Sequence, residues 1–232
     1  MSKEMLVQAF IDADLIGNFL EEMRANTVGQ NTLSFLEGED GPEMKVDSSK
    51  SKEFIGARVE GRSGFFVKTA QALMSLSPRQ GGVWRVAAFD LSEKVAIEII
   101  ETLRLFPVEF AFACTWGEFI QKNKLVIDSQ YGTEESWVGL NYNNYIPGIY
   151  WKTLIKKNLL NNNLESEHYN VSFDAYSIYL ERQSRADQWH ASDSKSIADA
   201  FIIPIFDKEN VEKSLIGVNN FLDISDQLRR WD

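Results

Sequence analysis

The side chains that most often carry chemistry are scarce in this sequence. It contains two histidines, His168 and His190, and one cysteine, Cys114. Histidine and clustered carboxylates are common metal ligands, so the run Glu165-x-Glu167-His168 is the strongest candidate for a metal site. No second cluster with ligand spacing occurs elsewhere in the sequence, and we therefore expect no bound metal.

Covalent catalysis and phosphate binding also lack a recognisable motif. A serine or cysteine nucleophile needs a neighbouring base, and no Gly-x-Ser-x-Gly sequence is present. Cys114 ends the apolar run at 110–114, which is typical of a small buried hydrophobe. No glycine-rich loop with Lys-Ser or Lys-Thr opens a helix, as a phosphate cradle would require. We therefore expect a protein that is not an enzyme and needs no cofactor.

Two alternatives from other functional classes stay open. Asp and Glu are abundant, and a pair of carboxylates can hydrolyse a substrate without leaving a motif in the sequence. Such a small hydrolase-like enzyme would show a concave pocket with carboxylates of shifted pKa. A structural or scaffold subunit of a bacterial assembly would instead show a large apolar self-interface.

The charge balance narrows the class of partner. The 34 acidic and 24 basic residues give a formal net charge of -10. This excess argues against nucleic acid, because phosphate binding depends on Lys and Arg, and against an anionic membrane surface. A cationic protein is the partner that this charge favours, since opposite fields speed the encounter. A homodimer stays open.

The composition indicates one folded domain. The 232 residues are 44% hydrophobic and include 15 Phe and 6 Trp, so the chain can bury a sizeable core. No linker or low-complexity segment divides it, and we expect residues 1–232 to form a single compact domain. One cysteine excludes an internal disulfide. No secretory signal or membrane-spanning window is visible, which makes the cytoplasm the expected compartment.

Hydrophobic periodicity predicts an α+β fold. We expect strands over 5–11, 32–36, 54–59, 83–89, 108–115, 125–128 and 169–180. The strand at 108–115 is so apolar that both its faces should be covered. We expect helices over 12–24, 65–76, 92–105, 116–121, 149–160, the start of 197–206, 210–222 and 226–231. Segments 37–47, 130–136 and 183–195 are polar, and the first two are acidic, which is typical of loops.

Two segments share one layout. Residues 5–23 and 83–103 each read as an apolar strand with a Phe near its end, then an Asp, then an amphipathic helix. This echo favours a mainly antiparallel sheet with helices on one face, and a pseudo-duplication of 1–80 and 81–232 is compatible with it.

The stretch at 145–160 organises the second half of the chain. Pro147 and Gly148 form a turn signal, and apolar residues then recur at 150/151, 154/155 and 159. We expect a helix with Trp151 buried and with Lys152, Lys156 and Lys157 on its other side.

This stretch also carries a resemblance. Its sequence at 147–154, Pro-Gly-Ile-Tyr-Trp-Lys-Thr-Leu, resembles the Gly-x-x-Trp-hydrophobic-Thr/Asn helix start of bacterial immunity proteins. Those proteins neutralise toxins of type VI secretion and polymorphic-toxin systems. The order of elements over 83–206 is also similar to theirs. One family feature, a Gly-Asp pair with a nearby Pro after the late strand, has no counterpart at 183–193.

The resemblance implies a protein that binds a cognate toxin stoichiometrically and blocks its active site or substrate entry. The acidic excess would suit a cationic toxin such as a nuclease. Aromatic anchors within a polar rim are usual at interfaces. The implied partner-binding residues are the anchors Trp137, Tyr142 and Tyr145 and the charged Asp128, Glu134 and Glu135. The acidic loop at 37–43 is a second candidate surface.

Overall fold

A computed structural model of the chain describes residues 4–26, 33–41, 44–45, 48–129, 132–137, 146, 148–160, 164–189 and 193–206. Its strands are β1 (Met5–Asp12), β2 (Ser34–Leu36), β3 (Met44–Lys45), β4 (Phe65–Lys68), β5 (Leu73–Pro78), β6 (Val83–Leu91), β7 (Val108–Thr115), β8 (Lys124–Ser129), β9 (Gly132–Trp137), β10 (Lys152–Lys156), β11 (Tyr169–Phe173) and β12 (Ser177–Arg182). Its α-helices are α1 (Ile16–Asn26), α2 (Ser48–Glu60), α3 (Glu93–Leu103) and α4 (Trp116–Asn123). Short 3-10 segments are η1 (Ala13–Leu15), η2 (Gln80–Gly82), η3 (Lys157–Leu159) and η4 (Asp193–Ala200).

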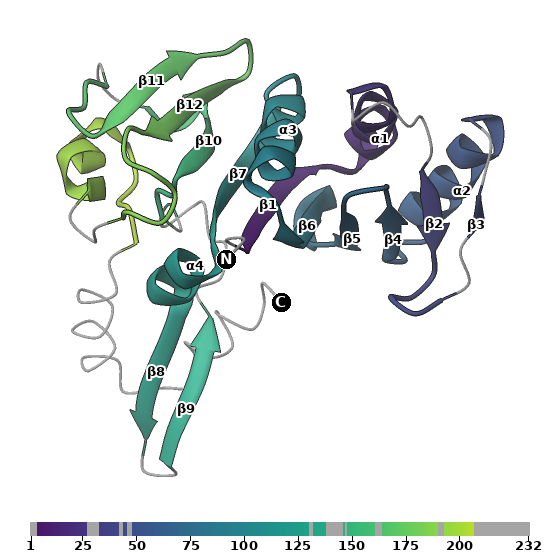
Figure 1. Cartoon of the computed structure of the whole chain (residues 1–232), viewed down its shortest axis with the longest axis horizontal. Helices are drawn as coiled ribbons and strands as arrows, with labels where there is room; N and C mark the ends of the chain where they lie inside the picture. The colour runs from purple at the N-terminus through teal and green to yellow at the C-terminus, as the bar shows by residue number, and fades with distance from the viewer. Residues whose placement is uncertain are drawn as a thin grey trace.

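One large sheet organises the molecule (Figure 1). Within the described residues it has ten strands in the order β11-β12-β10-β7-β1-β6-β5-β4-β2-β3. Every neighbouring pair in it is antiparallel. The remaining strands, β8 and β9, form a separate two-stranded sheet. The α+β architecture with a mainly antiparallel sheet, predicted from the sequence, is confirmed.

The centre of the sheet is covered on both faces. On one face, side chains of β1 such as Val7 and Ala9 pack into a core with α1, α2 and α3. On the other face, Phe110 and Phe112 of β7 pack into a second core with the segment before β10 and with η4. A strand buried on both sides reads as a continuous apolar run, which confirms the prediction made for 108–115.

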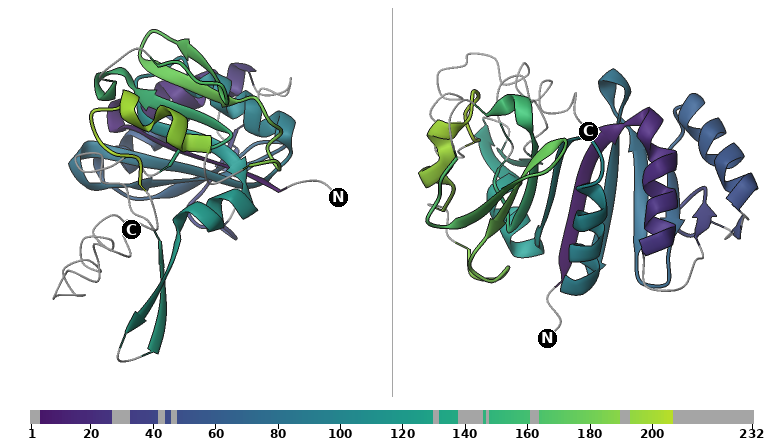
Figure 2. Two further views of the ribbon diagram at one scale, coloured as in Figure 1. Left: turned by 90° about the vertical axis from the view of Figure 1, so that its left-hand side faces the viewer. Right: turned by 90° about the horizontal axis from the view of Figure 1, so that it is seen from above.

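Three helices lie side by side along one face of the sheet (Figure 2, right). The clearest of them, α3, begins as predicted, because the Ser92 side chain accepts a hydrogen bond from the Val95 N–H at 3.3 Å. The segments β1–α1 and β6–α3 share the predicted layout, and α1 contacts α3. The origin of this pair by duplication stays a prediction. No helix in the described part of the chain is long and apolar enough to cross a membrane.

The helix predicted over 149–160 is wrong, because the structure has β10 there. The pairs of apolar residues at 150/151 and 154/155 fit a helix, but they fit a strand that is buried on both faces equally well. Lys152, predicted to face solvent, is only 4% exposed, and its ammonium contacts the Tyr179 hydroxyl at 2.8 Å and the Glu181 carboxylate. Trp151 is buried as predicted.

In two neighbouring segments the predicted types of secondary structure are the reverse of those observed. Residues 54–59, expected as a strand, belong to α2, where Ser51 and Ile55 are buried four residues apart. Residues 65–76, expected as a helix, form β4 and β5, in which Phe65 and Val67 are buried in alternation. The helix α2 begins at Ser48, before the predicted strand, and its Ser51 is fully buried.

Smaller corrections concern strand limits. The single strand predicted at 169–180 is the antiparallel pair β11 and β12. Most of the loop predicted at 130–136 is β9. The acidic loop at 37–47 does connect an antiparallel pair, because β3 pairs with β2. The helices predicted at 210–222 and 226–231 lie outside the described residues.

Candidate partner-binding site

The β8–β9 hairpin projects away from the body of the molecule (Figure 1; Figure 2, left). Its two six-residue strands pair over their whole length, from Lys124 opposite Trp137 to Ser129 opposite Gly132. A six-residue strand spans about 20 Å, so the ribbon reaches well beyond the sheet. In the part of the chain that the structure describes, neither strand pairs with the large sheet.

Four of the six predicted partner-binding residues lie on this ribbon. Asp128 is opposite Thr133, while Glu134 and Glu135 are opposite Ile127 and Val126. Asp128 and Glu134 belong to the outer half of the ribbon, and Glu135 is one pair further in. Opposite residues share one face of a ribbon and successive residues alternate, so Asp128 and Glu135 occupy one face and Glu134 the other.

The other predicted residues are not all brought together. Trp137 occupies the position opposite Lys124, at the inner end of the ribbon. Tyr142 and Tyr145 lie outside the described residues. The second candidate surface, at 37–43, follows β2, five strand spacings from β7 or about 24 Å across the sheet. Its Glu37 is ion-paired with Arg58 of α2.

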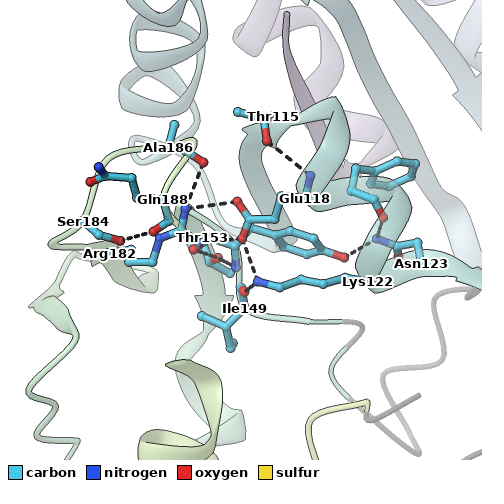
Figure 3. A network of polar contacts seen from close by, with 12 residues as sticks. Thr115, Glu118, Lys122, Asn123, Ile149, Thr153, Arg182, Ser184, Ala186 and Gln188 are labelled. Atoms are coloured by element: carbon cyan, nitrogen blue, oxygen red, sulfur yellow. Dashed lines mark hydrogen bonds and ion pairs between the residues drawn. The ribbon is translucent and has the colours of Figure 1, made fainter. Parts of the chain in front are cut away.

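The root of the hairpin is the junction of α4 with β8, and a buried ion-pair network holds it (Figure 3). Glu118 of α4 is fully buried, and its carboxylate accepts hydrogen bonds from the Arg182 guanidinium at 2.7 and 3.3 Å. Lys122, one turn later, donates to the same carboxylate at 2.6 Å. Arg182 also donates to the Ala186 carbonyl at 3.0 Å. These contacts fix α4 against the end of β12.

The same helix holds the place where the chain returns from the hairpin. The Lys122 ammonium donates to the backbone carbonyl of Ile149. The Asn123 side-chain amide donates to the Tyr150 hydroxyl at 2.6 Å and to the Phe119 carbonyl at 3.0 Å. Because Asn123 directly precedes β8, these contacts join the start of β8 to the chain at Ile149 and Tyr150.

An aromatic core supports this junction. The Tyr150 ring stacks on Phe112 of β7 with 4.0 Å between ring centroids, and the Thr153 hydroxyl accepts from the Tyr150 N–H at 2.8 Å. Burial raises the pKa of the Tyr150 phenol well above its usual value, and burial likewise raises the pKa of the Cys114 thiol. Both groups therefore stay neutral, and Cys114 is the small buried hydrophobe that the sequence predicted.

No family model, curated protein or solved structure matches the chain. The function must therefore be argued from the geometry of its own residues.

The described residues offer little for chemistry. They contain no group of three or more His, Cys, Asp and Glu side chains that could hold a metal ion. In the candidate run at 165–168, the Ser166 hydroxyl accepts from the backbone N–H groups of His168 and Tyr169 at 3.1 and 3.2 Å, which is a local turn.

The residues of the root network were missed by sequence reasoning. The available signal was Thr115-x-x-Glu118, a capping-box pattern, and half of that box forms, because the Thr115 hydroxyl accepts from the Glu118 N–H at 3.2 Å. The Glu118 carboxylate turns instead to Arg182, which lies 64 residues away and which no local pattern connects to it.

Proposed function

We propose that this protein is a bacterial immunity protein, which neutralises a cognate toxin by stoichiometric contact in the cytoplasm. The β8–β9 hairpin is the contact element, and its acidic outer half enters the substrate-binding region of a cationic toxin. The observation that supports this proposal most is the position of Asp128, Glu134 and Glu135 on a ribbon that projects from the body.

Charge and shape both favour this kind of partner. The chain carries a net charge of -10, which would draw a cationic surface toward it over a distance of about 10 Å in physiological salt. A two-stranded ribbon is narrow enough to enter a cleft that a whole domain cannot enter. A cleft that binds a polyanionic substrate offers the positive charges that carboxylates need. A nuclease therefore fits the proposal well.

The rigid root gives the ribbon a physical advantage as an inhibitor. Ordering a loop on binding costs free energy that subtracts from the affinity. The contacts of Glu118, Lys122 and Asn123 fix the root before any partner arrives. Less ordering remains to be done at the encounter, so more of the contact energy contributes to binding.

The test is direct neutralisation of the toxin encoded beside this chain. Purified chain and toxin should form a 1:1 complex that lacks toxin activity, and the chain alone should turn over no substrate. Charge reversal by Glu134→Lys with Glu135→Lys should slow association by about ten-fold at low salt, because steering by opposite charge is lost. Cells expressing the variant should lose protection.

A matched control makes the same change of charge elsewhere. Glu53→Lys with Glu60→Lys alters two exposed positions on α2, far from the ribbon, and should leave association within about two-fold of the wild type. Equal effects of the two double variants would show that net charge acts and that the hairpin is not the contact element. Absence of any complex with the toxin would overturn the proposed function.

A further inference from the structure

An exposed aromatic pair lies where α4 begins. Phe89 of β6 is 39% exposed and Trp116 of α4 is 40% exposed. Their rings meet edge to face, with 6.1 Å between centroids and 84° between planes. Large aromatic side chains are usually taken into the core, and these two instead offer a joint apolar surface to solvent.

A β-bulge places Phe89 at this surface. In the register of β1 with β6, Met5 pairs with Leu91 and Val7 with Ala88, so one residue of β1 opposes two of β6, Phe89 and Asp90. Asp90 within the bulge has φ +55°, in the left-handed region that non-glycine residues rarely adopt. Bulges commonly redirect a side chain next to a functional site. Here the burial alternation of β6 is interrupted at Phe89 and Asp90, and both are exposed.

Three acidic residues lie at the corner of the sheet that carries the aromatic pair. Met5 pairs with both Leu91 and Thr115, so the start of β1 meets the ends of β6 and β7 at one corner of the sheet. The exposed residues Glu4, Asp90 and Glu93 lie at this corner. Glu4 is held against the pair, because its backbone carbonyl accepts from the Trp116 N–H at 3.2 Å.

The pair is continuous with the hairpin root. Trp116 stacks on Phe119 at 5.5 Å, Phe119 on Phe112 at 6.0 Å, and Phe112 on Tyr150, which Asn123 holds. The eight residues of α4 separate Trp116 from the root by about 12 Å. One partner seated on the ribbon would therefore reach this corner as well.

We infer that the Phe89–Trp116 pair is a second contact, which receives an arginine or lysine side chain of the same cationic partner. This inference rests on the proposed function and names a further part of its surface. A cation over an indole ring is attracted by the ring's negative face, and nearby carboxylates add to that attraction. Arginine fits best, because its planar guanidinium can stack on the ring while it donates to carboxylates.

Another exposed aromatic pair supplies the control. Phe173, the last residue of β11, and Tyr176, in the turn before β12, are 57% and 50% exposed. The carboxylate between them, Asp174, is already paired with the Arg104 guanidinium by two hydrogen bonds of 2.8 Å. That turn therefore has aromatic rings without an available negative charge, and it should attract cations less.

The first arm of the test needs no toxin. Tri-arginine amide is titrated into the full chain, and the indole N–H resonances are followed by NMR, with Trp116→Phe used for assignment. The Trp116 resonance should move most and saturably, the shift should shrink with added salt and with Asp90→Asn, and tri-glutamate should produce none. An equal response at the other tryptophans, or a response unchanged by Asp90→Asn, would overturn the inference.

The second arm uses the adjacent toxin. Trp116→Ala should weaken binding by about ten-fold, as expected of an interface anchor, whereas Phe173→Ala should stay within about two-fold. Trp116→Phe keeps a ring and should recover part of the loss, and far-UV circular dichroism verifies that each variant is folded. A toxin that binds Trp116→Ala as tightly as the wild type overturns the inference and leaves the proposed function standing. Tri-arginine binding at Trp116 without any toxin complex overturns the proposed function and, with it, the toxin as the source of the cation, while the aromatic pair stands as a site for cationic side chains.

Discussion

The two hairpins on either side of β10 in the sequence are held in opposite ways. The β11–β12 hairpin belongs to the large sheet, where β12 pairs with β10 along Lys152–Lys156. Its turn is also fixed, because Asp174 binds Arg104 from the end of α3. The β8–β9 hairpin pairs only with itself among the described strands, and the helix that precedes it is fixed to the body at its root.

The difference shows what each hairpin is built to do. Fixing a hairpin along its length and at its turn adds stability to the sheet, but its backbone edges and side chains are then used in contacts within the protein. Fixing a hairpin at its root gives it a direction, and in the proposed function its outer half meets the partner. The two are linked, since Arg182 at the end of β12 binds Glu118 at the root of the other hairpin.

The largest effect is expected from breaking that link. Glu118→Ala would leave Arg182, which is 1% exposed, without its counter-charge. Removing one partner of a buried ion pair costs about 3–5 kcal/mol of the free energy of unfolding. Urea denaturation measures the loss, and hydrogen exchange should increase in α4 and at the start of β8 before it increases in β11 and β12.

The control for this variant is a pair at the surface. Lys94→Ala removes the 3.8 Å pair with Glu98 on an exposed side of α3, and should change stability by less than about 0.5 kcal/mol. The double variant Glu118→Leu with Arg182→Met should recover part of the loss, because apolar residues of similar volume can replace a buried pair. Equal stability of Glu118→Ala and Lys94→Ala would mean that the root needs no ion pair.

A smaller effect is expected at the turn of the other hairpin. Asp174→Ala removes both hydrogen bonds to Arg104, whose guanidinium also lies 4.1 Å from the centroid of the Tyr179 ring. The pair is partly exposed, at 23% and 18%, so we expect a loss of about 1–2 kcal/mol. Glu101→Ala is the matched control, because it removes a more exposed carboxylate from the same arginine. It should cost less than Asp174→Ala by thermal denaturation, and the reverse order would contradict the proposed anchoring.

The next effect concerns the returning chain at the root. Tyr150→Phe leaves the Asn123 amide without one acceptor, at a cost of about 1 kcal/mol. It should also change the alkaline limb of the stability profile. The unfolded phenol ionises near pH 10, whereas burial raises the pKa of Tyr150 in the folded state. Its contribution is therefore complete below about pH 10 and declines as the pH rises further.

Measurements of unfolding between pH 8 and pH 11 test the sign of this effect. Wild-type stability should fall more steeply above about pH 10 than that of Tyr150→Phe, because only the wild type must keep this phenol protonated. Tyr179, whose pKa burial also raises, should keep part of the slope in both proteins. Parallel profiles would show that the Tyr150 hydroxyl titrates freely in the folded state.

The smallest effect on stability is expected from charge reversal on the ribbon. Glu134→Lys with Glu135→Lys should alter the free energy of unfolding by less than about 0.5 kcal/mol, although it should slow association with the toxin strongly. A loss of unfolding free energy comparable with that of Glu118→Ala would mean that these ribbon positions stabilise the body of the protein. The two hairpins would then not differ in how they contribute to stability.

The elements that the sequence predicted correctly are those whose hydrophobic pattern fits only one type of secondary structure. The helix α3 has apolar residues four apart and a Ser92 cap, and β7 is apolar from Phe110 to Cys114, so both were found. The strand β10 was missed because pairs of apolar residues suit either period when both faces are buried. Lys152 gave a misleading polar signal, since the groups that bury it, Tyr179 and Glu181, lie 27 and 29 residues away.

The candidate site was predictable in the same uneven way. Local acidity drew attention to Asp128, Glu134 and Glu135, whereas the strand β9 that carries two of them was taken for a loop. Its Gly-Thr-Glu-Glu-Ser-Trp sequence has neither alternation nor apolar run, and only pairing with β8 makes it a strand. The Glu118–Arg182 contact depends on the tertiary fold and had no signal of its own.

The joining of Asn123 and Tyr150 has a consequence for how such a protein can diversify. The polypeptide departs after position 123 and is back on the body by position 146, where Ile146 is buried and its backbone bonds to Pro204 and Phe206. We expect that the sequence between those positions can be lengthened, shortened or exchanged without moving β7 or β10. A lineage that keeps the junction can therefore acquire a new recognition specificity by grafting, while the rest of the molecule stays as it is.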